Sequence, residues 1–103
     1  MSSEPAVLER RSRALASAEP ARILGDNRIG IEKEGLRVSP AGRIAATPHP
    51  VGLGSALTHP HITTDFSEAL IEFITPALVD PAEVIAFLRD LHVEVYRHLG
   101  DEL

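Results

Sequence analysis

The segment from residue 80 to residue 100 restricts the fold most, because it predicts a helix with both ends marked. Asp80 suits an N-cap, Pro81 suits the first helical position, and Glu83 places a carboxylate where it complements the helix dipole. Gly100 suits the residue that follows a helix. Apolar residues recur at helical spacing in between: Val84, Ile85, Leu88, Leu91, Val95 and Leu99. A helix of this length depends mainly on tertiary packing, so the preceding residues must supply a surface for it.

The preceding residues predict strands. Residues 28–38 alternate with period two, and we expect Ile29, Ile31 and Leu36 to pack while the carboxylates face away. Residues 39–42 predict a turn, and residues 43–47 predict the returning arm of a hairpin. Residues 62–75 are rich in strand formers, although residues 67–71 could instead form a helical turn or a bulge. We therefore expect an α+β fold, an antiparallel sheet with flanking helices.

The other segments are less informative. Residues 6–18 predict a helix whose arginines are solvated, and residues 20–27 read as a connector. Residues 48–61 hold three Pro and two Gly, which predicts a shaped loop with a short helical turn at most.

Composition excludes several classes of protein. The chain of 103 residues has no Cys, which rules out disulfide scaffolds and thiolate metal sites. Its net charge of −5 argues against binding nucleic acid through a basic face. No apolar stretch approaches the roughly 20 residues of a membrane span, and the N-terminus lacks the pattern of a signal peptide. We therefore expect a cytoplasmic chain with neither a membrane nor a nucleic-acid partner.

Glu32 and Glu34 form the most informative pair. On a strand they point to the same face, roughly 6.6 Å apart. Two such carboxylates repel one another unless a cation lies between them, and oxygen-only ligands suit Mg²⁺ or Mn²⁺ rather than Zn²⁺. The alternative is a solvated strand face with Lys33 and Arg37 nearby, because Glu-x-Glu is a weak motif.

A second acidic group lies in residues 65–72. Glu72 stands between two apolar residues, an expensive place for a charge without a partner. If this segment pairs beside residues 28–38, Asp65 and Glu72 could join the first pair around shared metal ions, whereas Glu68 is expected to face outward. A zinc site of His59, His61 and Asp65 is the competing interpretation, but nothing completes it at a familiar spacing. We assign those two histidines, together with His92 and His98, to structure.

The literal sequence closely resembles a known family. The strings are GIEKEGLRV at 30–38, T-x-H-P at 47–50, LGSALTH at 53–59, ITTDFSEALIEFITP at 62–76, FLRDLH at 87–92 and GDE at 100–102. Together they resemble the N-terminal region of the proteobacterial glutamate–cysteine ligases, in order from about residue 28 onward, whereas residues 1–27 show only a plausible helical lead-in. One small departure is Gly35, where some relatives have Thr.

The resemblance implies an ATP-dependent carboxylate–amine ligase that joins L-glutamate to L-cysteine, the first step of glutathione synthesis. It also implies a fold similar to glutamine synthetase, with an antiparallel sheet that holds ATP, both amino acids and Mg²⁺, or Mn²⁺ in its place. Carried over by motif, Glu32, Glu34 and Glu72 match metal ligands. Asp65 matches an acidic catalytic and substrate-binding residue, and Phe66 matches an aromatic residue of the cysteine pocket.

Length is the large departure from this family, whose chains are several times longer. We therefore expect residues 1–103 to be the N-terminal part of a single catalytic domain, either a truncated gene product or a sequence fragment, and to be inactive alone. The alternative is a small non-catalytic protein that keeps the acidic strand motif to bind a metal or a partner. The sequence leaves the oligomeric state open.

Overall fold

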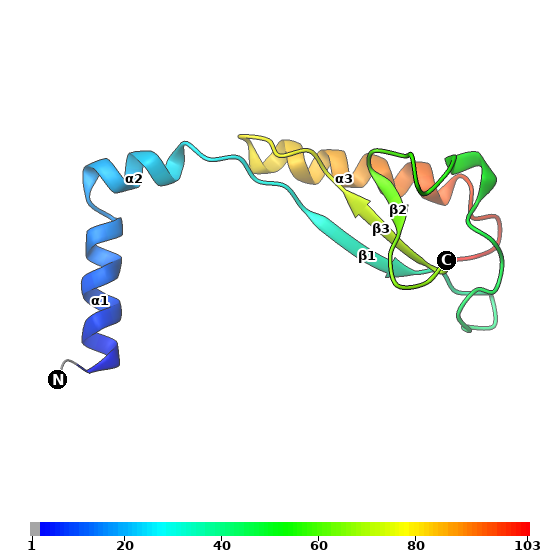
Figure 1. Ribbon diagram of the computed structural model, residues 1–103, viewed down its shortest axis with the longest axis horizontal. Coiled ribbons are helices and arrows are strands. Elements are labelled where there is room, and N and C mark those ends of the chain that lie inside the picture. The colour runs from blue at the N-terminus through cyan, green and yellow to red at the C-terminus, as the bar shows by residue number, and fades with distance from the viewer. Residues whose placement is uncertain (1–2) are drawn as a thin grey trace.

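The computed structural model describes residues 3–103 and confirms the α+β class (Figure 1). Two helices begin the described chain, and a three-stranded sheet with one long helix follows them. The elements are α1 (Glu4–Leu15), α2 (Ala18–Gly25), β1 (Glu32–Leu36), the 3-10 turn η1 (Val51–Leu53), β2 (Ile62–Thr64), β3 (Leu70–Ile74) and α3 (Pro81–Tyr96). No helix among these described residues is both long and apolar enough to cross a membrane.

The sheet is antiparallel throughout, with strand order β1-β3-β2. Residues 62–75, ambiguous from sequence, form a hairpin in which β2 and β3 flank the turn at residues 65–69. β3 pairs on its other side with β1, which places Glu34 directly opposite Glu72. The second acidic segment, residues 65–72, therefore does pair beside residues 28–38, as a shared cation site requires.

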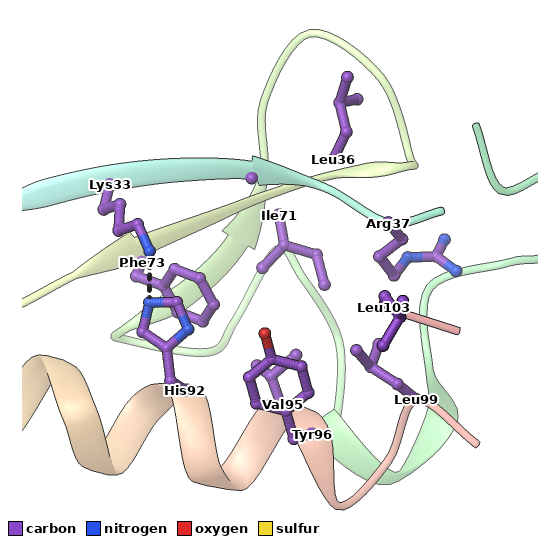
Figure 2. Close-up of a pocket in the computed structure, with 11 residues that line it drawn as sticks. Lys33, Leu36, Arg37, Ile71, Phe73, His92, Val95, Tyr96, Leu99 and Leu103 are labelled. Atoms are coloured by element: carbon purple, nitrogen blue, oxygen red, sulfur yellow. Dashed lines mark hydrogen bonds between the residues drawn. The ribbon is translucent and has the colours of Figure 1, made fainter. Parts of the chain in front are cut away.

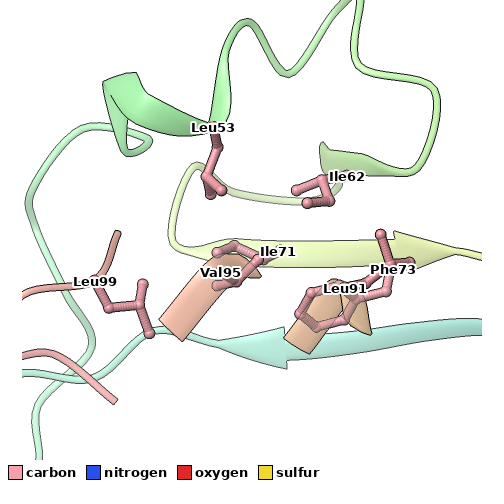
Figure 3. Close-up of a cluster of buried hydrophobic side chains, with 7 residues drawn as sticks. All are labelled: Leu53, Ile62, Ile71, Phe73, Leu91, Val95 and Leu99. Carbon is pink, nitrogen blue, oxygen red and sulfur yellow. The ribbon is translucent and has the colours of Figure 1, made fainter. Parts of the chain in front are cut away.

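The core lies between β2–β3 and α3 (Figure 3). Ile62 of β2 and Ile71 and Phe73 of β3 form its centre. Ile71 and Phe73 are two residues apart and Ile62 pairs with Phe73, so all three side chains point to the same face of the sheet. Leu91 and Val95 of α3 cover them, and the remaining members are Leu53 and Leu99. Most of the apolar residues predicted for the helical face are buried, but Ile85 is 57% exposed.

The ends of α3 follow the sequence in part. The Asp80 side chain caps the helix by accepting a hydrogen bond from the Ala82 N–H at 2.9 Å, and Pro81 is the first helical residue. The helix ends at Tyr96, earlier than its apolar repeat suggests, so Gly100 does not directly follow it. Gly100 instead has a φ of +67° in a later turn, which a glycine adopts without strain.

The N-terminal segment differs from its prediction. The predicted helix over 6–18 is α1, which ends at Leu15, and the predicted connector over 20–27 is largely the helix α2. Pro20 is compatible with α2 because it lies in the first turn, where backbone N–H groups have no helical partner. Figure 1 shows both helices projecting away from the sheet, and neither buries a residue.

The turn and loop predictions are confirmed. Gly42 has a φ of +77° in the turn at residues 39–42, and Val38 forms a single bridge with Ile44 where a full returning strand was expected. Residues 48–61 form a loop containing η1. Gly52 lies against the His98 ring so closely that a Cβ there would come within 2.1 Å of it.

Candidate functional site

Three carboxylates converge on the sheet face opposite α3. Glu34 comes from β1, Glu72 from β3, and Asp65 from the start of the turn after β2. One oxygen from each lies within 4.8 Å of the other two. Glu34 and Asp65 are exposed and Glu72 is half-buried, so the group opens to solvent on one side.

The crowding of these carboxylates changes their acidity. The pKa of Glu34 is raised above its ordinary value, first by a hydrogen bond with the Asp65 carboxyl and then by desolvation. The negative charges of Asp65, Glu72 and Glu32 raise it further. A group of carboxylates that holds a proton more tightly than usual is one in which a cation would relieve the same repulsion.

Glu32 and Phe66 lie apart from this cluster. Glu32 is on the same strand face as Glu34, as its spacing predicts, but opposite Ile74, and it is not one of the three converging side chains. Phe66 follows Asp65 in the turn and is 96% exposed. The described residues therefore leave its aromatic ring in solvent rather than in an enclosed pocket.

The strand prediction over residues 28–38 is wrong in part. The strand β1 covers only Glu32–Leu36, and Ile29, which was expected to pack, is 39% exposed. Leu36 shares the face of Glu32 and Glu34, because alternate residues of a strand point the same way, and it is 49% exposed. The face that looks toward α3 carries Lys33 and Gly35 instead. β1 therefore contributes no buried apolar side chain to the core.

The contacts of Glu68 and His59 agree with the structural roles expected for these two residues. The Glu68 carboxylate accepts a hydrogen bond from the His49 backbone N–H at 2.9 Å, away from the converging carboxylates. The His59 ring accepts from the backbone N–H groups of His61 and Ile62, both at 3.0 Å. Because Nδ1 of His59 is occupied in this way, these hydrogen bonds support a loop-shaping role rather than a zinc site.

Arg37 has a structural role that its sequence pattern does not predict. The alternative interpretation of the Glu32–Glu34 pair, a solvated strand face, places Arg37 nearby in solvent, but Arg37 is only 2% exposed. In the sequence, Arg37 simply lies near the end of the predicted strand and precedes Val38. That position does not distinguish a buried arginine from a solvated one.

The donor set fits a hard divalent cation. Three carboxylates from different strands and a turn supply only oxygen, which suits Mg²⁺ or Mn²⁺. Open solvent on one side leaves room for waters and for substrate oxygens, which Mg²⁺ commonly keeps among its ligands. Mg²⁺ held by carboxylates of this kind is one component of the sites that transfer phosphate groups.

The fold is similar to parts of two solved enzymes, a glutamate–cysteine ligase and a bifunctional glutathione synthetase. The chain superposes with a TM-score of 0.72 and 40% identity on a glutamate–cysteine ligase from Francisella tularensis solved in complex with AMP, covering 75% of this chain and 16% of that one. It superposes with a TM-score of 0.74 and 36% identity on a bifunctional glutathione synthetase from Pasteurella multocida, covering 79% of this chain and 11% of that one.

The chain belongs to the glutamate–cysteine ligase family, whose family model matches residues 13–103. The match begins earlier than the resemblance noted from residue 28. A glutamate–cysteine ligase from Alcanivorax borkumensis is 56% identical over 96 residues, 93% of this chain and 18% of that protein. One from Pseudomonas putida is 64% identical over 74 residues, 72% of this chain and 14% of that protein. The chain thus spans less than a fifth of the length of these curated relatives.

Proposed function

We propose that residues 1–103 form the N-terminal, cation-holding part of a catalytic domain that makes γ-glutamylcysteine. The single observation that carries this proposal is the convergence of Glu34, Asp65 and Glu72 on one sheet face in a chain of this family. Residues 1–27 would be a helical lead-in to that domain. The complete ligase would act in the cytoplasm on L-glutamate, L-cysteine and ATP, without a nucleic-acid or membrane partner.

The proposed reaction has two steps. An oxygen of the glutamate γ-carboxylate attacks the γ-phosphorus of ATP, ADP leaves, and an acyl phosphate forms. The cysteine amine then attacks the acyl carbon, inorganic phosphate leaves, and the amine loses a proton as the amide forms. Bound Mg²⁺ would neutralise negative charge on the phosphate oxygens, which is the main requirement of such transfers.

The chain's own residues would hold and orient the reactants. Glu34 and Glu72, facing each other across β1 and β3, would hold the cation, with Glu32 as a further ligand on the same face. Asp65 supplies the third converging carboxylate and would also contact substrate. Phe66, exposed in the same turn, would lie against the cysteine side chain.

A full-length ligase that carries these residues tests the proposal. Such a protein is made by replacing the matched segment of the Pseudomonas putida ligase with the corresponding residues of this chain. We expect γ-glutamylcysteine formation that depends on ATP and Mg²⁺ and that is lost in Glu34→Gln but kept in Glu68→Gln. A full-length protein that folds, binds Mg²⁺ and makes no product would favour the non-catalytic metal-binding alternative.

A further inference from the structure

β1 holds Glu34 in place without any buried side chain of its own. All five of its residues are exposed, and its sequence EKEGL includes a glycine, which weakens a strand. Figure 2 shows Lys33 reaching across the open cavity between β1 and α3 to the His92 ring, at 2.9 Å. Burial of apolar side chains normally sets the register of a strand, since a slip of one residue turns every side chain to the other face. β1 lacks that means of fixing its register.

The carboxylates add a force that opposes the observed register. Glu34 lies directly opposite Glu72, and like charges in that position destabilise a strand pair. One oxygen of each of Glu34, Asp65 and Glu72 lies within 4.8 Å of the other two, so a third like charge adds to this repulsion. The register that builds the cation site must therefore be fixed from outside the strand.

Arg37, directly after β1, makes the contacts that can do this. Its Nη1 donates to Thr47 Oγ1 and to Glu102 Oε2, both at 2.7 Å. Its Nη2 donates to the Thr47 carbonyl at 2.8 Å and to the Glu68 carbonyl at 3.3 Å. Its backbone N–H donates to the Ala69 carbonyl at 2.9 Å, which extends the β1–β3 ladder by one more bond.

These partners lie on three different segments. Thr47 belongs to the loop after the 39–42 turn, and Glu102 lies beyond α3 and is itself hydrogen-bonded by Thr47. Glu68 and Ala69 belong to the turn that carries Asp65. The guanidinium therefore ties the end of β1 to the same turn that positions the third carboxylate.

The other end of β1 is held in a similar way. The Ile31 N–H donates to Thr75 Oγ1 at 2.8 Å, and the Thr75 N–H donates to the Ile31 carbonyl at 2.9 Å. Arg37 and Thr75 are the two buried polar residues among the described residues 3–103. They bracket an exposed strand that has no other buried anchor.

We propose that Arg37 is a positioning residue for the cation site. Its buried, four-way hydrogen-bonded guanidinium fixes the register of β1 against β3 and the position of the Asp65 turn, and so sets the distance between the carboxylates. An uncompensated buried charge is costly, so the network forms only when all three segments are in place. The inference rests on the proposed function in that the carboxylates are taken to hold a divalent cation.

The test uses the full-length ligase that carries these residues. Arg37→Lys keeps the positive charge but cannot reproduce the planar set of guanidinium hydrogen bonds. Arg37→Met removes both the charge and the hydrogen bonds. Arg43→Met is the matched control, because it removes a positive charge from an exposed arginine close by in the sequence. Hydrogen–deuterium exchange of the β1 peptide reports the strand pairing, and titration with Mn²⁺ followed by electron paramagnetic resonance reports cation affinity.

We expect Arg37→Lys to speed exchange in the β1 peptide and to weaken Mn²⁺ binding by about tenfold or more, as is usual when a residue that orients metal ligands is lost. The α3 peptide should keep its protection, and the Mg²⁺ concentration for half-maximal rate should rise more than the KM for glutamate. Arg43→Met should change none of these. If Arg37→Met does not fold, Arg37→Lys decides the question.

Two results would overturn the inference. One is unchanged β1 exchange and Mn²⁺ affinity in Arg37→Lys, and the other is equal loss of protection in α3 and β1, which marks a merely structural role. Failure of the proposed function gives a different result, namely no Mn²⁺ binding by the unmodified protein. Selective loosening of β1 in Arg37→Lys would in that case still support the positioning of the strand.

Discussion

Glu34 of β1 and Glu72 of β3 are direct cross-strand partners, and Asp65 lies close enough for all three carboxylates to bind the same cation. A sheet gains nothing from this pairing by itself, since like charges opposite each other are destabilising. The repulsion between these carboxylates destabilises β1, a weak strand that the buried residues Arg37 and Thr75 hold at its two ends. The arrangement makes physical sense when a cation lies among the three carboxylates.

Removing one carboxylate charge should therefore damage catalysis. In the full-length ligase, Glu34→Gln and Glu72→Gln should each lower kcat by about a hundredfold or more, and Glu32→Gln should also lower it heavily. Glu68→Gln is the control, because a glutamine oxygen can still accept the hydrogen bond from the His49 N–H. Steady-state rates at varied Mg²⁺ measure the effect. Equal damage from Glu68→Gln would contradict this division of the acidic residues.

Phe66→Ala tests the cysteine pocket. The side chain is 96% exposed, so its loss should cost the fold of residues 1–103 little. In the full-length ligase we expect the KM for cysteine to rise about tenfold, with much smaller changes for glutamate and ATP, because an apolar contact with a small side chain is worth roughly 1–3 kcal/mol. Initial rates with each substrate varied in turn provide the comparison, and equal increases for all three would indicate a packing role.

Gly35→Thr should stabilise β1. A Cβ at this position would meet no atom within 4 Å, and the residue faces away from Glu34 and Glu72. Because Thr favours strands and Gly weakens them, we expect a gain of about 0.5–1 kcal/mol with unchanged Mn²⁺ affinity. Urea unfolding of the full-length ligase measures the gain. A loss of stability would show that an element of the complete protein occupies this space.

Glu102 should make stability depend on acid pH. Its pKa is lowered below the ordinary value, first by the hydrogen bond from Thr47 and then by that from Arg37. A lowered carboxyl pKa gives stability that is present above about pH 4.3, the ordinary Glu value, and is lost as the pH falls through the lower folded value. Thermal unfolding from pH 3 to 7 should show Glu102→Gln less stable near neutrality, with the difference closing in acid. A difference independent of pH would exclude the ion pair as its source.

Residues 1–103 alone should show no ligase activity and should fold poorly. The sheet has three strands, β1 is exposed along its whole length, and three carboxylates are too few ligands to retain Mg²⁺ firmly. We expect partial helicity by circular dichroism, a broad thermal transition, and no phosphate release with ATP, glutamate, cysteine and Mg²⁺. A sharp cooperative melt together with measurable γ-glutamylcysteine would overturn this expectation.

The sequence determined the features that local chemistry controls. The cap at Asp80, the helical repeat of α3 and the turn at Gly42 could be predicted because each depends on neighbouring residues alone. The same-face placement of Glu32 and Glu34 follows from the period of a strand. A local pattern misled the prediction at Pro20, because proline is compatible with the first turn of α2.

Only the tertiary structure decided which carboxylates meet and what holds them. The pairing of β1 with β3 brings together Glu34 and Glu72, and the β2–β3 turn adds Asp65, whereas Glu32 stays outside the cluster. The burial of Arg37 depends on partners in three segments that are distant in sequence. Such contacts form when distant segments pack and exclude water, and the free energy of that packing is a property of the assembled fold rather than of any short stretch of residues.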